Sequence, residues 1–215
     1  NLAKKYYLLT ETTIQCRNKM GLYAIAMNSL ALYYESDEKN YDLAKKYYLM
    51  AIEEGCIKSM HNLAYYYHQI EKDYDLLKKY YLMAIERDCT EAMYNFANYY
   101  QYVEKKYDLT KKYYLMAIER DYTEAMNNLA HYYQNVEKNY DLMKKYYEMA
   151  IVKDFAISMN NLAWHYKIIE KNYDLAKKYY VMAIEKDNDH AMNNLGHYYE
   201  TIEKKLSSLG ASIKR

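Results

Sequence analysis

"KKYYLMAIE" occupies residues 45–53 and returns unchanged at 78–86 and 111–119, with near copies at 144–152 and 177–185. A second block keeps the same 33-residue step. It reads SMHNLAYYY, AMYNFANYY, AMNNLAHYY, SMNNLAWHY and AMNNLGHYY, starting at Ser59, Ala92, Ala125, Ser158 and Ala191, and a weaker copy begins at Ala26. A fixed period of this size indicates stacked supersecondary units.

Both blocks have helical periodicity. Apolar residues recur at spacings of three and four in the first block, at Ala44, Tyr47, Tyr48, Ala51 and Ile52. Asp42 lies just before this stripe, where an N-cap residue is expected. The linkers at 71–74 and 87–90 are short, so the two helices should form an antiparallel hairpin. One hairpin cannot bury its apolar stripe alone, and neighbouring hairpins must therefore stack.

The repeated residues resemble a known family. The frame M-x-x-L-[AG]-x-x-Y, followed by A-x-x-x-Y-x-x-A in the second helix, is similar to the tetratricopeptide repeat (TPR), and AIEEGCIKSMHNLAYYY is closer to the Sel-one-like repeat (SLR). The resemblance implies an all-α fold, a right-handed α-solenoid of stacked antiparallel helix hairpins with a period of 33 residues. The sequence departs from that consensus at one turn, where EKNY-type residues replace the Gly-x-Gly loop. Its composition, rich in Tyr, Asn and Lys, resembles the repeat arrays of giant DNA viruses.

The two ends depart from the repeat. We expect a partial leading helix and an atypical loop over 1–23, tandem repeats over 24–203, and a degenerate cap or frayed tail over 204–215. LAKKYYLL at 2–9 resembles a second helix, and a long loop is predicted over 10–22. KLSSLGASIKR, at 205–215, has lost the twin Lys and twin Tyr of that helix. The missing initial Met suggests a piece of a longer chain.

Composition favours a folded protein without a strong charge. The chain is 52% hydrophobic with net charge +1, which gives no general attraction to nucleic acid or membrane, and no apolar window is long enough to span a bilayer. Three Cys suit free thiols in a reducing compartment, such as the cytoplasm of a host cell or a virion. The 33 Tyr against two Phe favour a thin layer in which rings pack inside and hydroxyls reach the edge.

Chemical motifs are missing from the sequence. It has no Gly-rich phosphate loop, no HExxH and no CxxC, and its six His never stand four apart, so we expect no enzyme, no cofactor and no metal site. Cys56 and Cys89 are one period apart, about 10 Å in stacked helices, which is beyond disulfide reach. The Lys pairs starting at Lys45 form a ladder that could bind nucleic acid, but nearby acidic residues favour a solvated face.

Four rows of the first helix vary between repeats, and they share one helix face. The rows are Lys58, Glu91, Glu124, Ile157, His190; His61, Tyr94, Asn127, Asn160, Asn193; Tyr65, Asn98, His131, Trp164, His197; and His68, Gln101, Gln134, Lys167, Glu200. The resemblance implies that this face lines a concave groove for partner peptides. A constant Asn row beside it either holds a ligand backbone or makes a structural hydrogen bond to the neighbouring turn.

We therefore predict a non-enzymatic interaction scaffold or adaptor that binds a protein or extended peptide, with no small-molecule substrate and no membrane partner. The predicted partner-binding residues are Asn62, Tyr65, Tyr94, Asn95, Asn98, Asn128, His131, Asn161, Trp164, Asn194 and His197. One alternative is a structural spacer or a virion or assembly component. The second is nucleic-acid binding along the Lys ladder. The sequence does not predict an oligomeric state.

Overall fold

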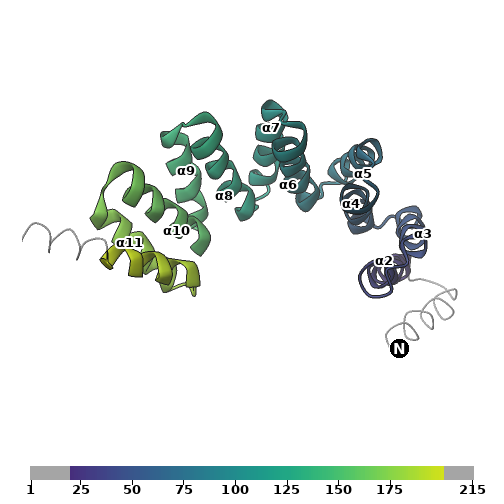
Figure 1. Cartoon of the computed structure of the whole chain (residues 1–215). Helices are drawn as coiled ribbons and strands as arrows, with labels where there is room; N and C mark the ends of the chain where they lie inside the picture. The colour runs from purple at the N-terminus through teal and green to yellow at the C-terminus, as the bar shows by residue number, and fades with distance from the viewer. Residues whose placement is uncertain (1–19, 201–215) are drawn as a thin grey trace, which may run out of the picture. The chain divides into compact units, whose positions relative to one another are not determined.

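The structure, a computed structural model, describes residues 20–200, and every regular element in that range is a helix. The chain divides into two compact units, the first ending at Met116 and the second beginning at Ala117. Within each unit, helices that follow one another along the chain pack side by side as antiparallel hairpins (Figure 1). The predicted α-solenoid architecture is confirmed.

The helices alternate between the two repeated blocks. The first unit contains α2 (Met20–Ser36), α3 (Tyr41–Glu53), α4 (Ile57–Tyr66), η1 (Tyr67–Glu71), α5 (Tyr74–Glu86), α6 (Thr90–Tyr99), η2 (Tyr100–Glu104) and most of α7 (Tyr107–Ile118). The second contains α8 (Thr123–Tyr132), η3 (Tyr133–Glu137), α9 (Tyr140–Ile151), α10 (Ala156–His165), η4 (Tyr166–Glu170), α11 (Tyr173–Ile184) and a helix over 189–200. Each η element is a π-helical turn, which the sequence did not predict.

Tyrosine rings fill the core of every hairpin. A tyrosine near the end of the first helix, which begins the π-turn in every pair except that of Tyr34, stacks on a tyrosine of the second, with ring centroids 5.4–5.7 Å apart and planes within 9° of parallel. These pairs are Tyr34–Tyr47, Tyr67–Tyr80, Tyr100–Tyr113, Tyr133–Tyr146 and Tyr166–Tyr179. Leu63 and Ala64 are fully buried beside them, as are their equivalents in the inner repeats. The stack therefore joins the two helices of each hairpin.

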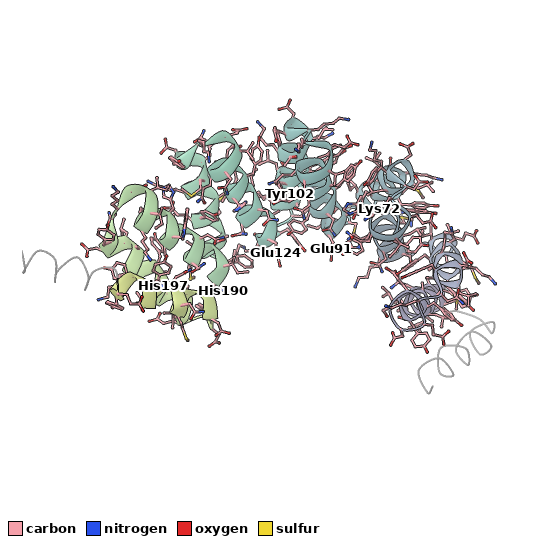
Figure 2. The ribbon with its side chains drawn as sticks, viewed as in Figure 1. Lys72, Glu91, Tyr102, Glu124, His190 and His197 are labelled. Atoms are coloured by element: carbon pink, nitrogen blue, oxygen red, sulfur yellow. The ribbon has the colours of Figure 1, made fainter. Side chains whose placement is uncertain are left out.

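Residues in left-handed conformation replace glycine at the turns. Lys72, labelled in Figure 2, has φ 57°, and Lys39, Lys105, Lys138 and Lys171 have φ between 51° and 55°. At the other turn Asp88 has φ 65°, where the first repeat has Gly55 at φ 86°. Asp tolerates this region better than most residues because its short polar side chain bonds locally. The hairpins therefore turn without glycine at these positions.

The predicted N-cap position was wrong. The side-chain oxygen of Asn40, not of Asp42, accepts the N–H of Leu43 at 3.2 Å, and Asp42 lies in the first helical turn. Asp73, Asn139 and Asn172 cap their helices in the same way. The helix begins two residues earlier than expected because the left-handed lysine turns the chain directly into the cap.

Two further expectations need correction. α2 begins at Met20, so the last three residues of the loop predicted over 10–22 are helical. The row containing Gln101 and Gln134 is not a free surface, since both glutamines are buried. The division into 1–23, 24–203 and 204–215 stays a prediction, because residues 1–19 and 201–215 lie outside the described range.

Replacing a cap tests the corrected turn. Asn139→Ala removes the acceptor for the N–H of Leu142, which lies 3.1 Å away, and should lower the free energy of unfolding by about 1 kcal/mol. Asp141→Ala, in the same first turn, loses an interaction with the helix dipole and a weak attraction to Lys144, and should cost about 0.5 kcal/mol or less. Chemical denaturation of both variants gives the order; a larger loss for Asp141→Ala would restore the original assignment.

Deleting one period tests whether stability is local. Removal of residues 91–123 joins Thr90 to Glu124 and restores the repeat register. A shorter folded array is expected, because within each unit the contacts join helices that follow one another along the chain. Far-UV circular dichroism should keep the helical signal per residue, and collapse of that signal would show that distant repeats depend on one another.

Candidate functional site

Trp164 lies at the surface of the second unit, as predicted. Its side chain is on α10 and is 41% exposed, while Leu162 and Ala163 beside it are fully buried. The same row is also exposed at His131 on α8. The tryptophan therefore lies outside the packed core of its hairpin, where the first-helix Leu and Ala rows are completely enclosed.

A hollow of about 280 Å³ lies beside Trp164. It is lined by His131, Gln134, Asn135, Tyr147, Asn160, Asn161 and Trp164, all within the second unit. None of these lining residues carries a permanent charge. Although His131 is exposed on one side, partial burial of its imidazole lowers its pKa. The hollow therefore offers one large aromatic ring and several neutral amide groups.

The amides that line the hollow have defined hydrogen bonds. The hydroxyl of Tyr147 donates to Oε1 of Gln134 at 3.2 Å, which leaves the Nε2 protons of Gln134 for other acceptors. Oδ1 of Asn160 accepts from Asn194 at 2.9 Å, so Asn160 keeps its Nδ2 donors. Asn135 donates to the carbonyl of His131 at 3.0 Å and keeps its oxygen. Both donors and acceptors remain for a polar ligand.

The constant Asn row joins adjacent repeats. Three of these asparagines donate from Nδ2 to an Asn Oδ1 that lies 34 residues earlier, at 2.9–3.2 Å. The pairs are Asn62 to Asn28, Asn161 to Asn127 and Asn194 to Asn160. Ser59 and Ser158 add a second donor to the same oxygens of Asn28 and Asn127. In these repeats the constant Asn therefore makes a structural hydrogen bond, which was one of the two predicted roles. Its partner is the first helix of the neighbouring repeat and not the neighbouring turn.

His61 takes the place of the acceptor Asn in one repeat. Its Nε2 lies 2.7 Å from Nδ2 of Asn95 and its Nδ1 lies 3.1 Å from Oδ1 of Asn62. An amide NH₂ can only donate, so Nε2 accepts and the proton is on Nδ1. Burial lowers the pKa of His61, which keeps this neutral tautomer.

The Lys ladder is paired with glutamates. Lys45 lies 2.7 Å from Glu71, Lys144 lies 2.5 Å from Glu170, and Lys78 makes the same ion pair with Glu104. Each glutamate belongs to the turn of the next repeat. For Glu104, burial acts to raise the pKa, but hydrogen bonds from Lys106, Lys78 and Tyr99 outweigh it and lower the pKa to about 2. The charge that a phosphate would need is compensated at these positions.

The second Lys of each pair lies over a tyrosine ring. Lys46, Lys79, Lys112, Lys145 and Lys178 place Nζ 5.2–5.9 Å from the ring centroids of Tyr47, Tyr80, Tyr113, Tyr146 and Tyr179. This is the range of a cation–π contact. The ladder thus shields the edge of the tyrosine core from water.

His165 departs from the pattern at a buried position. The equivalent Tyr66, Tyr99 and Tyr132 donate to Glu71, Glu104 and Glu137. His165 is fully buried, its Nε2 lies 3.1 Å from Glu170, and its Nδ1 has no hydrogen-bond partner among the described residues. Burial lowers the pKa of His165, with Lys144 acting in the same direction and Glu170 against it.

The structure brings together only part of the predicted site. His131, Asn161 and Trp164 meet at the hollow, with Asn194 bonded to its rim. Asn62, Tyr65, Tyr94, Asn95 and Asn98 lie on α4 and α6 of the first unit, and Asn98 already accepts the hydroxyl of Tyr114. Asn128 lies on α8, and His197 lies on the helix over 189–200. Binding at these residues stays a prediction.

Four lining residues were not among the predicted partner-binding residues. Gln134 and Asn160 are in rows that vary between repeats, which was a usable signal. Asn135 lies in the π-turn, and Tyr147 reaches the hollow from the second helix. Neither could be placed from helical periodicity, because the π-turn changes the direction of the side chains and Tyr147 also reads as a core residue.

The described residues were also searched for metal-binding groups, membrane-spanning helices and disulfide bonds. Within residues 20–200, no group of three or more His, Cys, Asp or Glu is arranged to hold a metal ion. Across the same residues, no helix has both the length and the apolar character needed to cross a bilayer. Cys56 and Cys89 are free thiols, and Cys89 is buried.

Comparison with known proteins gives the fold. No family model and no curated protein matches the chain. It is similar to a protective antigen of uropathogenic Escherichia coli displaying an SLR fold, with TM-score 0.67 and 21% identity over 85% of this chain and 42% of that one. It also resembles a Sel1 repeat protein from Oxalobacter formigenes, with TM-score 0.67 and 24% identity over 92% and 84% of the two chains.

An immunity protein from Pseudomonas aeruginosa is similar as well, with TM-score 0.53 and 25% identity over 78% of this chain and 66% of that chain. The chain spans less than half of the E. coli antigen. These likenesses support an SLR/TPR-like helical repeat. The three structures are bacterial, and the resemblance to arrays of giant DNA viruses stays a prediction.

The lowered pKa of His165 predicts that the protein loses stability in mild acid. A histidine whose pKa is lowered by folding binds its proton more readily in the unfolded chain, so stability falls as the pH drops below the unfolded value of 6.5. His165→Tyr restores the residue of the other repeats, whose hydroxyl donates to the turn glutamate. The variant should gain more stability at pH 5.5 than at pH 7.5, measured by chemical denaturation.

His197→Tyr is the matched control, because the His197 side chain is 75% exposed. It introduces the same new ring at a position where no buried imidazole is replaced. An equal gain for His165→Tyr at both pH values would mean that packing, and not protonation, limits this position.

Proposed function

We propose that the chain is a non-enzymatic protein-interaction module whose hollow beside Trp164 binds an extended segment of a protein partner. The observation that carries the proposal is the exposed indole next to a hollow lined by uncharged amides. Aromatic residues are the usual anchors of protein interfaces. Equivalent repeats have Tyr65, Asn98, His131 and His197 in this row, so packing does not require a tryptophan.

The chemistry of the hollow favours a peptide over a charged ligand. The Nε2 of Gln134 and the Nδ2 of Asn160 can donate to backbone carbonyls, and the oxygen of Asn135 can accept a backbone N–H. A carboxylate or phosphate would meet no lining Lys or Arg. An extended segment with one side chain on Trp164 and its backbone on the amides matches these groups best.

The alternatives have less support. Nucleic-acid binding along the Lys ladder is disfavoured because Lys45, Lys78 and Lys144 are paired with glutamates. A role as a structural spacer or assembly component does not require the hollow and makes no use of Trp164. We also propose a reducing compartment, such as the cytoplasm or a virion, which fits the free thiols of Cys56 and Cys89.

Partner capture by the full chain tests the hollow. Trp164→Ala should weaken capture by about 2 kcal/mol, roughly thirtyfold, if Trp164 is an anchor, while the melting temperature stays nearly unchanged. Leu82→Ala is the matched control, since Leu82 is also 41% exposed but lies on the second helix α5. Quantitative affinity capture with mass spectrometry should find proteins that the wild type and Leu82→Ala retain and Trp164→Ala loses.

Trp164 is the one tryptophan of the chain, so its fluorescence reports the hollow directly. Adding the captured partner should shift the emission of the wild type. Unfolding of Trp164→Ala would place the ring in the core, and an unchanged set of captured proteins would exclude the hollow as the binding site.

A further inference from the structure

The last described helix exposes residues that every inner repeat buries. Met192 is 51% exposed, whereas the equivalent Met60, Met93, Met126 and Met159 are 0–4% exposed. Tyr199 is 43% exposed, against 4–7% for Tyr67, Tyr100, Tyr133 and Tyr166. His190 and His197, labelled in Figure 2, mark this helix over 189–200. Its packing face is therefore uncovered within the described structure.

The sequence that follows in register does not suit this face. In the inner hairpins the face is covered by a second helix, whose tyrosine stacks on the π-turn tyrosine thirteen residues earlier, as in Tyr67–Tyr80. The corresponding pair after Tyr199 is Ser212 and Ile213, where the repeats have two tyrosines. Residues 205–215 thus lack the ring that would stack on Tyr199.

A matching second-helix sequence exists elsewhere in the chain. LAKKYYL at 2–8 is identical to LAKKYYL at 43–49 in α3. In the α2/α3 hairpin Tyr34 stacks on Tyr47 at 5.4 Å, and the hydroxyl of Tyr48 donates to Glu35 at 2.6 Å. The last helix presents the same acceptor pair, because Tyr199-Glu200 stands where α2 has Tyr34-Glu35. The other repeats have His, Gln or Lys at the glutamate position.

We propose that residues 2–9 of a second copy cover the helix over 189–200, so that copies of this chain associate head to tail. Tyr6 would take the place of Tyr47 on the ring of Tyr199, and Tyr7 would donate to Glu200 as Tyr48 donates to Glu35. The two surfaces differ, so the contact is heterologous. Association then continues into chains or closes into a ring.

Two variants block one surface each. Gly196→Glu blocks the tail: Gly196 stands in the row of the fully buried Ala64, Ala97, Ala130 and Ala163, yet a Cβ added there meets no atom within 4 Å in the single copy. Tyr6→Ser with Tyr7→Ile blocks the head by copying Ser212 and Ile213. Val152→Glu, at a position 83% exposed on the turn after α9, is the control for added charge.

Sedimentation velocity of the full chain over about a hundredfold concentration range gives the test. The wild type and Val152→Glu should associate as concentration rises, and each blocked variant alone should remain a monomer. An equimolar mixture of the two blocked variants should form dimers and stop there, because it contains one working head and one working tail. Circular dichroism should show that both variants keep their helix content.

Three results would overturn the proposal. They are a wild type that stays monomeric throughout the range, a blocked variant that still associates, and a mixture that stays monomeric while the wild type associates. The last result would indicate a symmetric contact that uses the same surface on both copies. None of these measurements involves Trp164, so the outcome is separate from that of the proposed hollow.

Discussion

The structure depends on one constraint: a buried tyrosine ring brings a hydroxyl that must reach a hydrogen-bond acceptor. A buried polar group without a partner costs about 1–3 kcal/mol, which is a large part of the stability of a protein. A core built from tyrosine must therefore be thin enough for each hydroxyl to reach its edge. Two layers of helices meet this condition, and a stack of hairpins repeats it along the chain.

The acceptors follow the same repeat as the rings. Tyr66, Tyr99 and Tyr132 donate to the glutamates of the hairpin turns, and these glutamates also hold lysines of the preceding repeat where both partners lie in one unit. Tyr48, Tyr114 and Tyr147 donate to Glu35, Gln101 and Gln134. Phe96 occupies a fully buried position where the equivalent repeats have Leu. The pattern explains why tyrosine outnumbers phenylalanine.

The helix hairpins could be predicted from the sequence, but several residues of the candidate site could not. The period and the spacing of Ala44, Tyr47 and Tyr48 predict the helices, because burial follows helical periodicity. The N-cap was misplaced because Asn40 and Asp42 both suit a cap, and the left-handed Lys39 that decides between them has no sequence signature. Trp164 was singled out because it departs from its row. Asn135 was not, because it lies in the π-turn, and Tyr147 was not, because its spacing on the second helix is that of a core residue.

The proposed binding surfaces are limited by the contacts that the repeats already make with one another. The Asn row and the Lys ladder are occupied by contacts between repeats, so neither is a free binding surface where those contacts form. The exposed ring of Trp164 lies beside this network, although Asn160 and Asn161 of the same hollow also bond between repeats. The proposed interaction site and the proposed head-to-tail contact both lie where one repeat departs from the others, at the indole of α10 and at the uncovered last helix.

The central claim is tested most directly by removing one tyrosine hydroxyl that has an acceptor and one that has none. Tyr147 donates to Gln134, whereas the buried hydroxyl of Tyr180 has no partner among the described residues, and Lys167 at the acceptor position of its repeat cannot accept. The account predicts that Tyr147→Phe lowers the free energy of unfolding by about 1 kcal/mol and that Tyr180→Phe leaves it unchanged or raises it. Equal losses for the two variants, or a larger loss for Tyr180→Phe, would contradict the account.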